Sequence, residues 1–315
     1  MNFFSSLLLL QLLCQITPSP QSYTVIPLRH RVDLAANFLQ PTDVAVGKNN
    51  FIYVMDGVNN TVKVFDEKGV FQFSFGGKGG EPGKCNRPVG IATDMAGQVY
   101  VADTGNRRIQ IFSAGGTFKQ QLLMPSTPGG DLREPVDVAV AEGLNRLYVS
   151  DNENHQVLVY SSPDYTLLST WGSEGSRVGQ FHYPFLIASG ENNALLVVDV
   201  LNSRVQIWRE DRAVVSIGSF GVDLGQFYRP KGVCADRNGA VYVSDSVLGV
   251  IQVFSGGGEF KAVLGTEQGE VLKWKTPVGI TVDQAHRLYV VEMIPNRVRV
   301  YDILSDRPIE KKYLP

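Results

Sequence analysis

This 315-residue chain has few histidines, no dense basic patch and no cluster of residues with the spacing of metal ligands. Its 29 basic and 31 acidic residues give a net charge of −2, and the basic residues are scattered. A nucleic-acid partner needs a dense basic face, so the composition argues against one. The four histidines share no short ligand spacing, which argues against a metal site. No nucleophile–base arrangement and no phosphate-binding glycine loop is present, so we expect neither a cofactor nor a metal.

Long hydrophobic runs are also missing, apart from Phe3–Leu13. That run is too short to span a bilayer as a stable helix. With the polar stretch that follows, it predicts a signal peptide over residues 1–22, although the first residues contain no Lys or Arg. We therefore expect a secreted or periplasmic protein without a stable membrane span. The alternatives are an N-terminal anchor, a lipid-modified Cys14, or no export.

Beyond that segment the chain holds only two cysteines, Cys85 and Cys234. Cys234 replaces an alanine found at the same place in other copies of a repeat described next, which predicts a small buried core residue. Cys85 falls in a loop of a different copy. The two are expected on opposite sides of the molecule, too far apart for a disulfide.

What the chain does have is one pattern in six copies between Pro41 and Tyr301. Each copy has a proline followed by an apolar run, then a second apolar run ending in an acid, then an alternating run. Successive prolines are 47, 47, 49, 46 and 47 residues apart, at Pro41, Pro88, Pro135, Pro184, Pro230 and Pro277. Such regular spacing is typical of repeat architectures.

The runs are rich in β-branched and aromatic residues and show a period of two, which predicts strands. With a fourth strand before most long loops, each copy becomes a four-stranded antiparallel sheet. A sheet this small buries both faces only when it is stacked between neighbours. We therefore predict an all-β, six-bladed β-propeller over residues 23–315. We expect Tyr23–Gln40 to supply the last outer strand, with Ile309–Leu314 as the alternative.

The segment from Pro88 to Phe112 resembles an NHL repeat, and similar glycine-rich linkers recur along the chain. The resemblance implies a propeller, but NHL proteins serve in protein binding, RNA binding and, among relatives, catalysis. The acid that ends the second run is followed in several copies by Asn and Arg, as in Asp103, Asn106 and Arg108. We expect these side chains to bond to one another and fix the turn.

Function is expected on the face that carries the long loops, where the residue before each proline should surround the mouth of the central channel. These residues are Gln40, Arg87, Glu134, Tyr183, Arg229 and Thr276. Asp43 and Asp137 should lie just inside them. Two guanidinium groups, an acid and aromatic rings suit a polar ligand or a protein surface. The predicted contact residues are Arg87, Glu134, Tyr183, Arg229 and Trp274; the alternative is that such residues pair with one another and with water.

From the sequence we expect a monomeric, non-catalytic scaffold that binds a protein or a small ligand on its loop face. The alternative is a propeller enzyme that resembles the amidating lyase or the metal-dependent lactonases. We favour binding because those enzymes rely on metal ligands in the channel, and this channel supplies few. Asp43, Asp137 and Glu134 could contribute to a Ca²⁺ site, but the channel mouth does not offer six clear oxygen donors.

Overall fold

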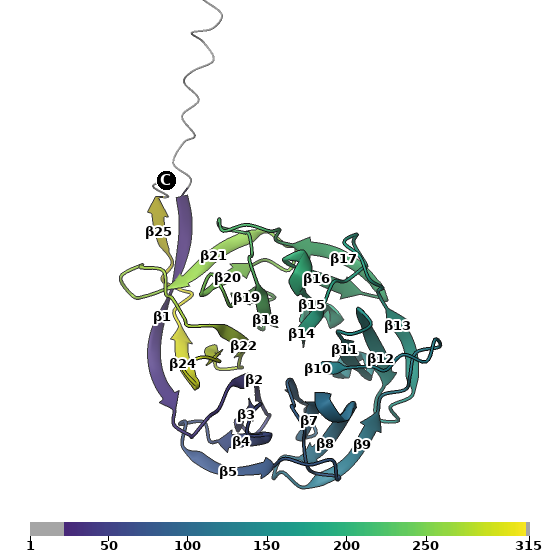
Figure 1. Ribbon diagram of the computed structural model, residues 1–315. Coiled ribbons are helices and arrows are strands. Elements are labelled where there is room, and N and C mark those ends of the chain that lie inside the picture. The colour runs from purple at the N-terminus through teal and green to yellow at the C-terminus, as the bar shows by residue number, and fades with distance from the viewer. Residues whose placement is uncertain (1–21, 313–315) are drawn as a thin grey trace, which may run out of the picture.

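The computed structural model describes residues 22–312, which form a ring of β-sheets around a central axis (Figure 1). Each four-stranded sheet runs outward from the axis, with its strands in sequence order. The first two four-stranded antiparallel sheets are β2–β5 and β6–β9. Their strands are β2 (Pro41–Val46), β3 (Ile52–Asp56), β4 (Thr61–Phe65), β5 (Phe71–Gly76), β6 (Ile91–Thr93), β7 (Gln98–Asp103), β8 (Arg108–Ser113) and β9 (Phe118–Leu123).

The next two four-stranded sheets, β10–β13 and β14–β17, repeat this order around the ring. Their strands are β10 (Pro135–Ala141), β11 (Arg146–Asp151), β12 (Gln156–Ser161), β13 (Leu167–Trp171), β14 (Pro184–Ser189), β15 (Leu195–Asp199), β16 (Arg204–Arg209) and β17 (Arg212–Ile217). Short 3-10 helices occupy some of the turns: η1 (Thr104–Asn106), η2 (Glu142–Leu144), η3 (Glu191–Asn193) and η4 (Val200–Asn202). The predicted all-β propeller with four-stranded antiparallel blades is thus confirmed.

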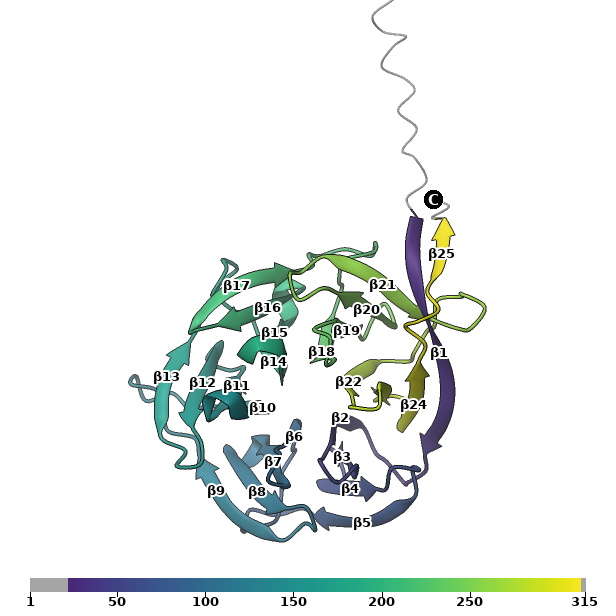
Figure 2. The ribbon, with the colours of Figure 1, turned by 180° about the vertical axis from the view of Figure 1, so that it is seen from behind.

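The ring is completed by a nine-stranded sheet of order β18-β19-β20-β21-β1-β24-β23-β22, with β25 paired to β1. Its strands are β1 (Ser22–Leu34), β18 (Pro230–Ala235), β19 (Val241–Asp245), β20 (Val250–Phe254), β21 (Phe260–Gly265), β22 (Pro277–Val282), β23 (Arg287–Glu292), β24 (Arg297–Ile303) and β25 (Ile309–Lys312). Figure 2 shows from behind how β1 follows the rim and carries β25 beside it.

The N-terminal strand closes the ring, as predicted. Leu28–Leu34 of β1 pair antiparallel with β24, while Val25–Pro27 pair parallel with β21. The C-terminal alternative, β25, pairs only with the first residues of β1. Of the predicted signal peptide, only Ser22 lies within the described residues. No helix within residues 22–312 is long and apolar enough to cross a membrane.

The hydrophobic core is divided among the interfaces between neighbouring blades. Middle strands are buried throughout, as in β3, whereas outer strands such as β5 are largely exposed or half-buried. A typical interface packs Tyr53 and Val64 of the β2–β5 blade against Ile91 and Phe112 of the next blade. Cys234 is buried in another such interface, as predicted, and both Cys85 and Cys234 are free thiols.

Candidate functional site on the loop face

A buried carboxylate at the end of the second strand organises the loop face in every repeat. All six acids have no exposed surface: Asp56, Asp103, Asp151, Asp199, Asp245 and Glu292. Each accepts a backbone N–H, at 2.7–3.0 Å, from the loop that enters its own blade. A carboxylate that accepts such bonds fixes the position of that loop. The acid therefore holds the segment that leads directly to the channel mouth.

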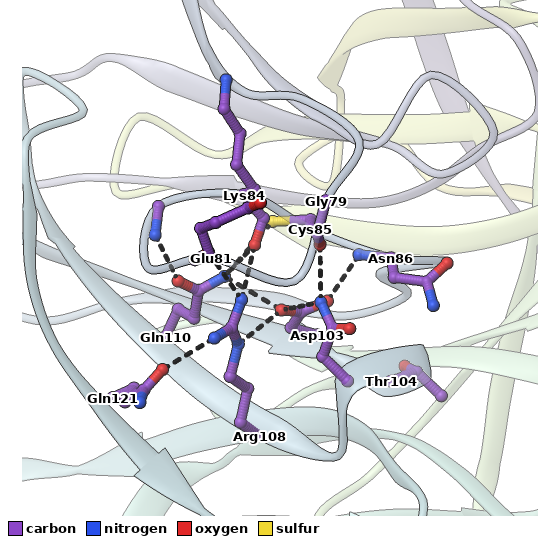
Figure 3. Close-up of polar contacts among 12 residues, drawn as sticks. Gly79, Glu81, Lys84, Cys85, Asn86, Asp103, Thr104, Arg108, Gln110 and Gln121 are labelled. Carbon is purple, nitrogen blue, oxygen red and sulfur yellow. Dashed lines mark hydrogen bonds and ion pairs between the residues drawn. The ribbon is translucent and has the colours of Figure 1, made fainter.

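Figure 3 shows this arrangement around Asp103. Its carboxylate accepts hydrogen bonds from the Arg108 Nε at 2.7 Å and from the Asn106 Nδ2 at 2.9 Å. It also accepts the Asn86 N–H at 2.7 Å, and the Arg108 guanidinium donates to the carbonyl oxygens of Glu81 and Lys84 in the same loop. The predicted Asp–Asn–Arg turn is confirmed here, and the Asp199–Arg204 pair repeats it at 2.7 Å.

Where the repeat lacks this arginine, other groups take its place, which the sequence pattern did not reveal. Lys63 pairs with Asp56 at 2.7 Å, and Arg133, from the preceding loop, pairs with Asp151 at 2.8 Å. Asp245 has no cationic partner within residues 22–312 and accepts backbone N–H groups instead, including those of Tyr228 and Val247. The buried acid is thus compensated by different chemistry in different repeats.

Four of the residues just before the prolines have a left-handed backbone. Their φ angles are 50° at Gln40, 48° at Arg87, 70° at Tyr183 and 50° at Thr276. This conformation costs a non-glycine residue roughly 1–3 kcal/mol and persists only where the surroundings enforce it. Here the enforcing bonds come from the preceding blade: the N–H groups of Arg87, Tyr183 and Gln40 donate to the side chains of Asn60, His155 and Asn296.

Four of the five predicted contact residues lie on this face, but Trp274 does not reach solvent. Arg87, Tyr183 and Arg229 are exposed and Glu134 is half-buried. Trp274 is only 4% exposed, and its Nε1 donates to the Tyr301 hydroxyl at 3.2 Å. The expectation of an accessible Trp274 was wrong, because its ring packs in the core between blades.

The repeat register contained the signal that identifies Trp274 as a core residue. It stands three residues before its proline, the position of Phe181 and Phe227 in other repeats. Both phenylalanines are fully buried and join the loop to the core. In five of the six repeats the side chain three residues before the proline packs inward; the exception is Leu132, which is 52% exposed.

Arg87 and Glu134 share a pocket between the β6–β9 and β10–β13 blades. The pocket has a volume of about 410 Å³ and also exposes Arg107, Asp131 and Glu153. Within residues 22–312, no ion pair joins Arg87 or Arg107 to a carboxylate. Tyr183 and Arg229 are not among the residues that line this pocket. The structure thus brings two of the predicted residues together and leaves the other two on another part of the face.

Asp43 and Asp137 face the channel, in a cavity of about 260 Å³. The Asp43 carboxyl accepts the Ile91 N–H at 3.0 Å, and that of Asp137 accepts the Ile187 N–H at 2.7 Å. Burial raises the pKa of Asp43 to about 7. The pKa of Asp137 is also raised well above its usual range, by burial and then by Asp43. Its Oδ1 atom is buried without a hydrogen-bond partner among the described residues.

This donor set does not fit the metal that a metal-dependent lactonase would require. In the described part of the chain, no three His, Cys, Asp or Glu side chains are grouped so that they could hold an ion. Burial raises the pKa of both channel carboxyls, and each already accepts a backbone N–H. A cation needs deprotonated oxygen ligands that are free to coordinate it.

Three segments match the NHL repeat family, at residues 38–65, 86–112 and 132–160. The chain therefore carries NHL repeats on a β-propeller fold. Over 92 residues it is 34% identical to the peptidyl-glycine alpha-amidating monooxygenase of Mus musculus and to that of Rattus norvegicus. Those matches cover 27% of this chain and span only 9% of the relatives' length.

Among solved structures, the fold is similar to a gluconolactonase from Xanthomonas campestris and a virginiamycin B lyase from Staphylococcus aureus. The gluconolactonase has a TM-score of 0.64 and 18% identity, over 92% of this chain and 100% of the other. The lyase, solved with quinupristin, has a TM-score of 0.59 and 16% identity, over 91% and 88%. At these identities the likeness shows the fold alone.

These comparisons contradict our expectation that the protein is not an enzyme. The neighbouring structures are named as a lyase and a gluconolactonase, and the curated relatives as amidating monooxygenases. Our expectation relied on the small number of metal ligands in the channel, yet acid–base chemistry requires only suitably placed ionisable side chains. The small number of metal ligands therefore argues only against a metal-dependent enzyme.

Proposed function

We propose that this protein is a propeller enzyme that acts on a carboxylate-bearing substrate in the pocket around Arg87 and Glu134. The observation that carries the proposal is the pocket itself, in which Arg87 and Arg107 form no ion pair with a carboxylate of residues 22–312 and acids lie beside them. Paired guanidinium donors match the geometry of a carboxylate. The likeness to named lyases and a lactonase supports an enzymatic reading.

Arg87 and Arg107 bind the substrate's anionic group, and Glu134 serves as the general base. Glu134 suits that role because its backbone is held on both sides. Its N–H donates to Asp151 and its carbonyl oxygen accepts the Asn152 N–H. A base that is already held in one position loses less conformational entropy when the substrate binds. Glu153, by contrast, lies on an exposed turn.

Proton removal by Glu134 supports either of two reactions. In a lyase reaction Glu134 takes a proton from a carbon beside a carbonyl, the electron pair of that bond forms a double bond, and the leaving group departs with its own pair. In hydrolysis Glu134 takes a proton from water, whose oxygen attacks the carbonyl carbon. The bond from that carbon to the leaving-group oxygen then breaks, and this oxygen takes the proton from Glu134. The guanidinium groups stabilise the negative charge that develops in both reactions. Reaction in ¹⁸O-water separates them, because only hydrolysis places ¹⁸O in the product.

The test is turnover of carboxylate-bearing lactones and esters, with gluconolactone and quinupristin as further substrates. Glu134→Gln should lower kcat by about 10²–10⁴-fold, the usual contribution of a general base. Arg87→Gln should raise KM, and Glu174→Gln, an exposed loop-face carboxylate outside the pocket, should change neither. Full activity in Glu134→Gln would show that the base is wrong. If the wild type accelerates none of these substrates, the enzyme proposal is wrong.

We also propose that the ring has six blades, with the nine-stranded sheet counted as two blades joined through β1. The first is β18–β21, and the second is β22–β24 with β1 as its outer strand. Antiparallel pairing of β1 with β24 and the six sequence repeats support this count. A crystal structure with five or seven blades would contradict it.

A further inference from the structure

One loop of the ring departs from the pattern of the others in a way that suggests a second binding site. The loops at 76–87, 172–183 and 218–229 share a backbone bridge between residues seven apart: Lys78 with Cys85, Glu174 with Phe181, and Phe220 with Phe227. The later member of each pair is buried. The earlier member is charged in the first two loops, but in the third it is Phe220, which is 68% exposed.

The same repeat contains a second departure, at the residue just after the proline. In the other five repeats this residue is uncharged: Thr42, Val89, Val136, Phe185 and Val278. Here it is Lys231, whose Nζ lies 4.3 Å from the centroid of the Phe185 ring. Lys231 is half-buried and, within residues 22–312, has no carboxylate partner. The pKa of its amine is lowered, first by burial and then by the charge of Arg229.

We propose that Arg229, Lys231 and the exposed rings of Phe220 and Tyr228 form a site for a small amphipathic carboxylate, with an aliphatic chain behind the charged group. Charge complementarity selects the carboxylate. Two neighbouring cations without an acidic partner repel each other, and one anion between them replaces that repulsion with two attractions. The acid of the same loop, Asp223, forms no ion pair with either cation in the described part of the chain.

The aliphatic chain is selected by the exposed apolar side chains of the loop that directly precedes Arg229 in the chain. The Phe220 and Tyr228 rings lie 5.3 Å apart, centroid to centroid, and Val222 is 70% exposed. Apolar side chains grouped on a rigid surface favour burial against an apolar partner.

The loop is already ordered for binding. Its backbone is closed by hydrogen bonds of Phe227 to Gly221 and Ser219, and the Gly225 N–H donates to the Gln252 side chain at 2.7 Å. A surface that is fixed before binding loses less entropy when the ligand arrives.

Decanoate is a suitable probe, used below its micelle concentration and followed by calorimetry and by NMR of the lysine side chains. We expect one equivalent to bind and to shift the Lys231 signal, with acetate at least 10-fold weaker. Arg229→Gln and Lys231→Gln should each weaken decanoate about 10-fold or more, the contribution of a charge-assisted hydrogen bond. Phe220→Ser should weaken decanoate but not acetate. Lys78→Gln, at the matched position of another loop, should have no effect.

The proposal is overturned if decyltrimethylammonium binds as well as decanoate, or if the double variant Arg229→Gln/Lys231→Gln binds decanoate normally. A variant that fails to fold is recognised by its melting curve, and Phe220→Ser then still tests the site because that ring is largely exposed. Binding is measured without turnover and can be repeated in Glu134→Gln. Failure here is therefore distinguishable from failure of the proposed enzyme activity.

Discussion

The buried carboxyl of Asp43 should make the stability of the ring depend on pH. Burial raises its pKa from the ordinary value of 3.8 to about 7. A raised carboxyl pKa means that the folded state holds the proton more tightly than the unfolded state. The resulting stabilisation is complete below about pH 4 and is lost as pH rises through about 7. At about 1.4 kcal/mol for each of roughly three pH units, ionisation costs about 4 kcal/mol.

Asp43→Asn should remove this cost. The amide oxygen can still accept the Ile91 N–H, and the side chain does not ionise. Because a chain of this size shifts by about 2 °C for each kcal/mol, the Tm of the variant relative to wild type should rise by roughly 8 °C between pH 4 and pH 9. Differential scanning calorimetry at constant ionic strength measures this difference in Tm. The Tm of the double variant Asp43→Asn/Asp137→Asn should depend on pH still less, since the pKa of Asp137 is raised too.

Asp103→Asn is the matched control, because Asp103 is also buried but bonds to a buried cation. It should lower stability by about 3–5 kcal/mol at both ends of the pH range, since Arg108 is left without its partner. The reasoning is refuted if the Tm difference between Asp43→Asn and wild type is the same at pH 5 and pH 9.

Three further predictions concern the scaffold and the chain's export. Arg204→Ala should lower the free energy of unfolding in urea by about 3–5 kcal/mol, because Asp199 keeps a buried charge; Arg87→Ala should change it by less than about 1 kcal/mol. Removing residues 1–34 should lower Tm far more than removing residues 309–315, since β1 pairs with β24 whereas β25 pairs with β1; equal losses would contradict closure by the N-terminus. Mass spectrometry of the native protein should find a start near Tyr23, and an intact Met1 in the cytosol would exclude export.

The fold could be predicted from the sequence because the same pattern of strands recurs in every repeat. One alternating run such as Val62-Lys-Val-Phe65 is weak evidence for a strand, but its equivalents recur at nearly equal spacing. The closing strand was predictable for a related reason. A last repeat that lacks its outer strand leaves an open edge, and Thr24–Leu34 has the length and pattern to cover it.

The site could be predicted only in part, because the pattern places a residue along a strand but does not say which way a loop side chain turns. Arg87 and Glu134 were located correctly on the loop face. Trp274 was not, since aromatic character alone suits both an exposed contact and a core position. The pairing of Arg133 with Asp151 was also missed, because the cation comes from a loop and breaks the repeat's own spacing.

The charged residues of the scaffold differ from those of the candidate sites in whether they have a partner of opposite charge or other hydrogen-bond donors. Buried acids such as Asp103 and Asp199 are each surrounded by donors from the same repeat, so their substitution should affect stability first. Arg87 and Lys231 have no acidic partner within residues 22–312, and neither is fully buried. A cation outside any ion pair contributes little electrostatic stability to the fold, but it remains available to an anion from outside. Stability and binding should therefore be separable by mutation on this face, with buried carboxylates controlling the first and unpaired cations the second.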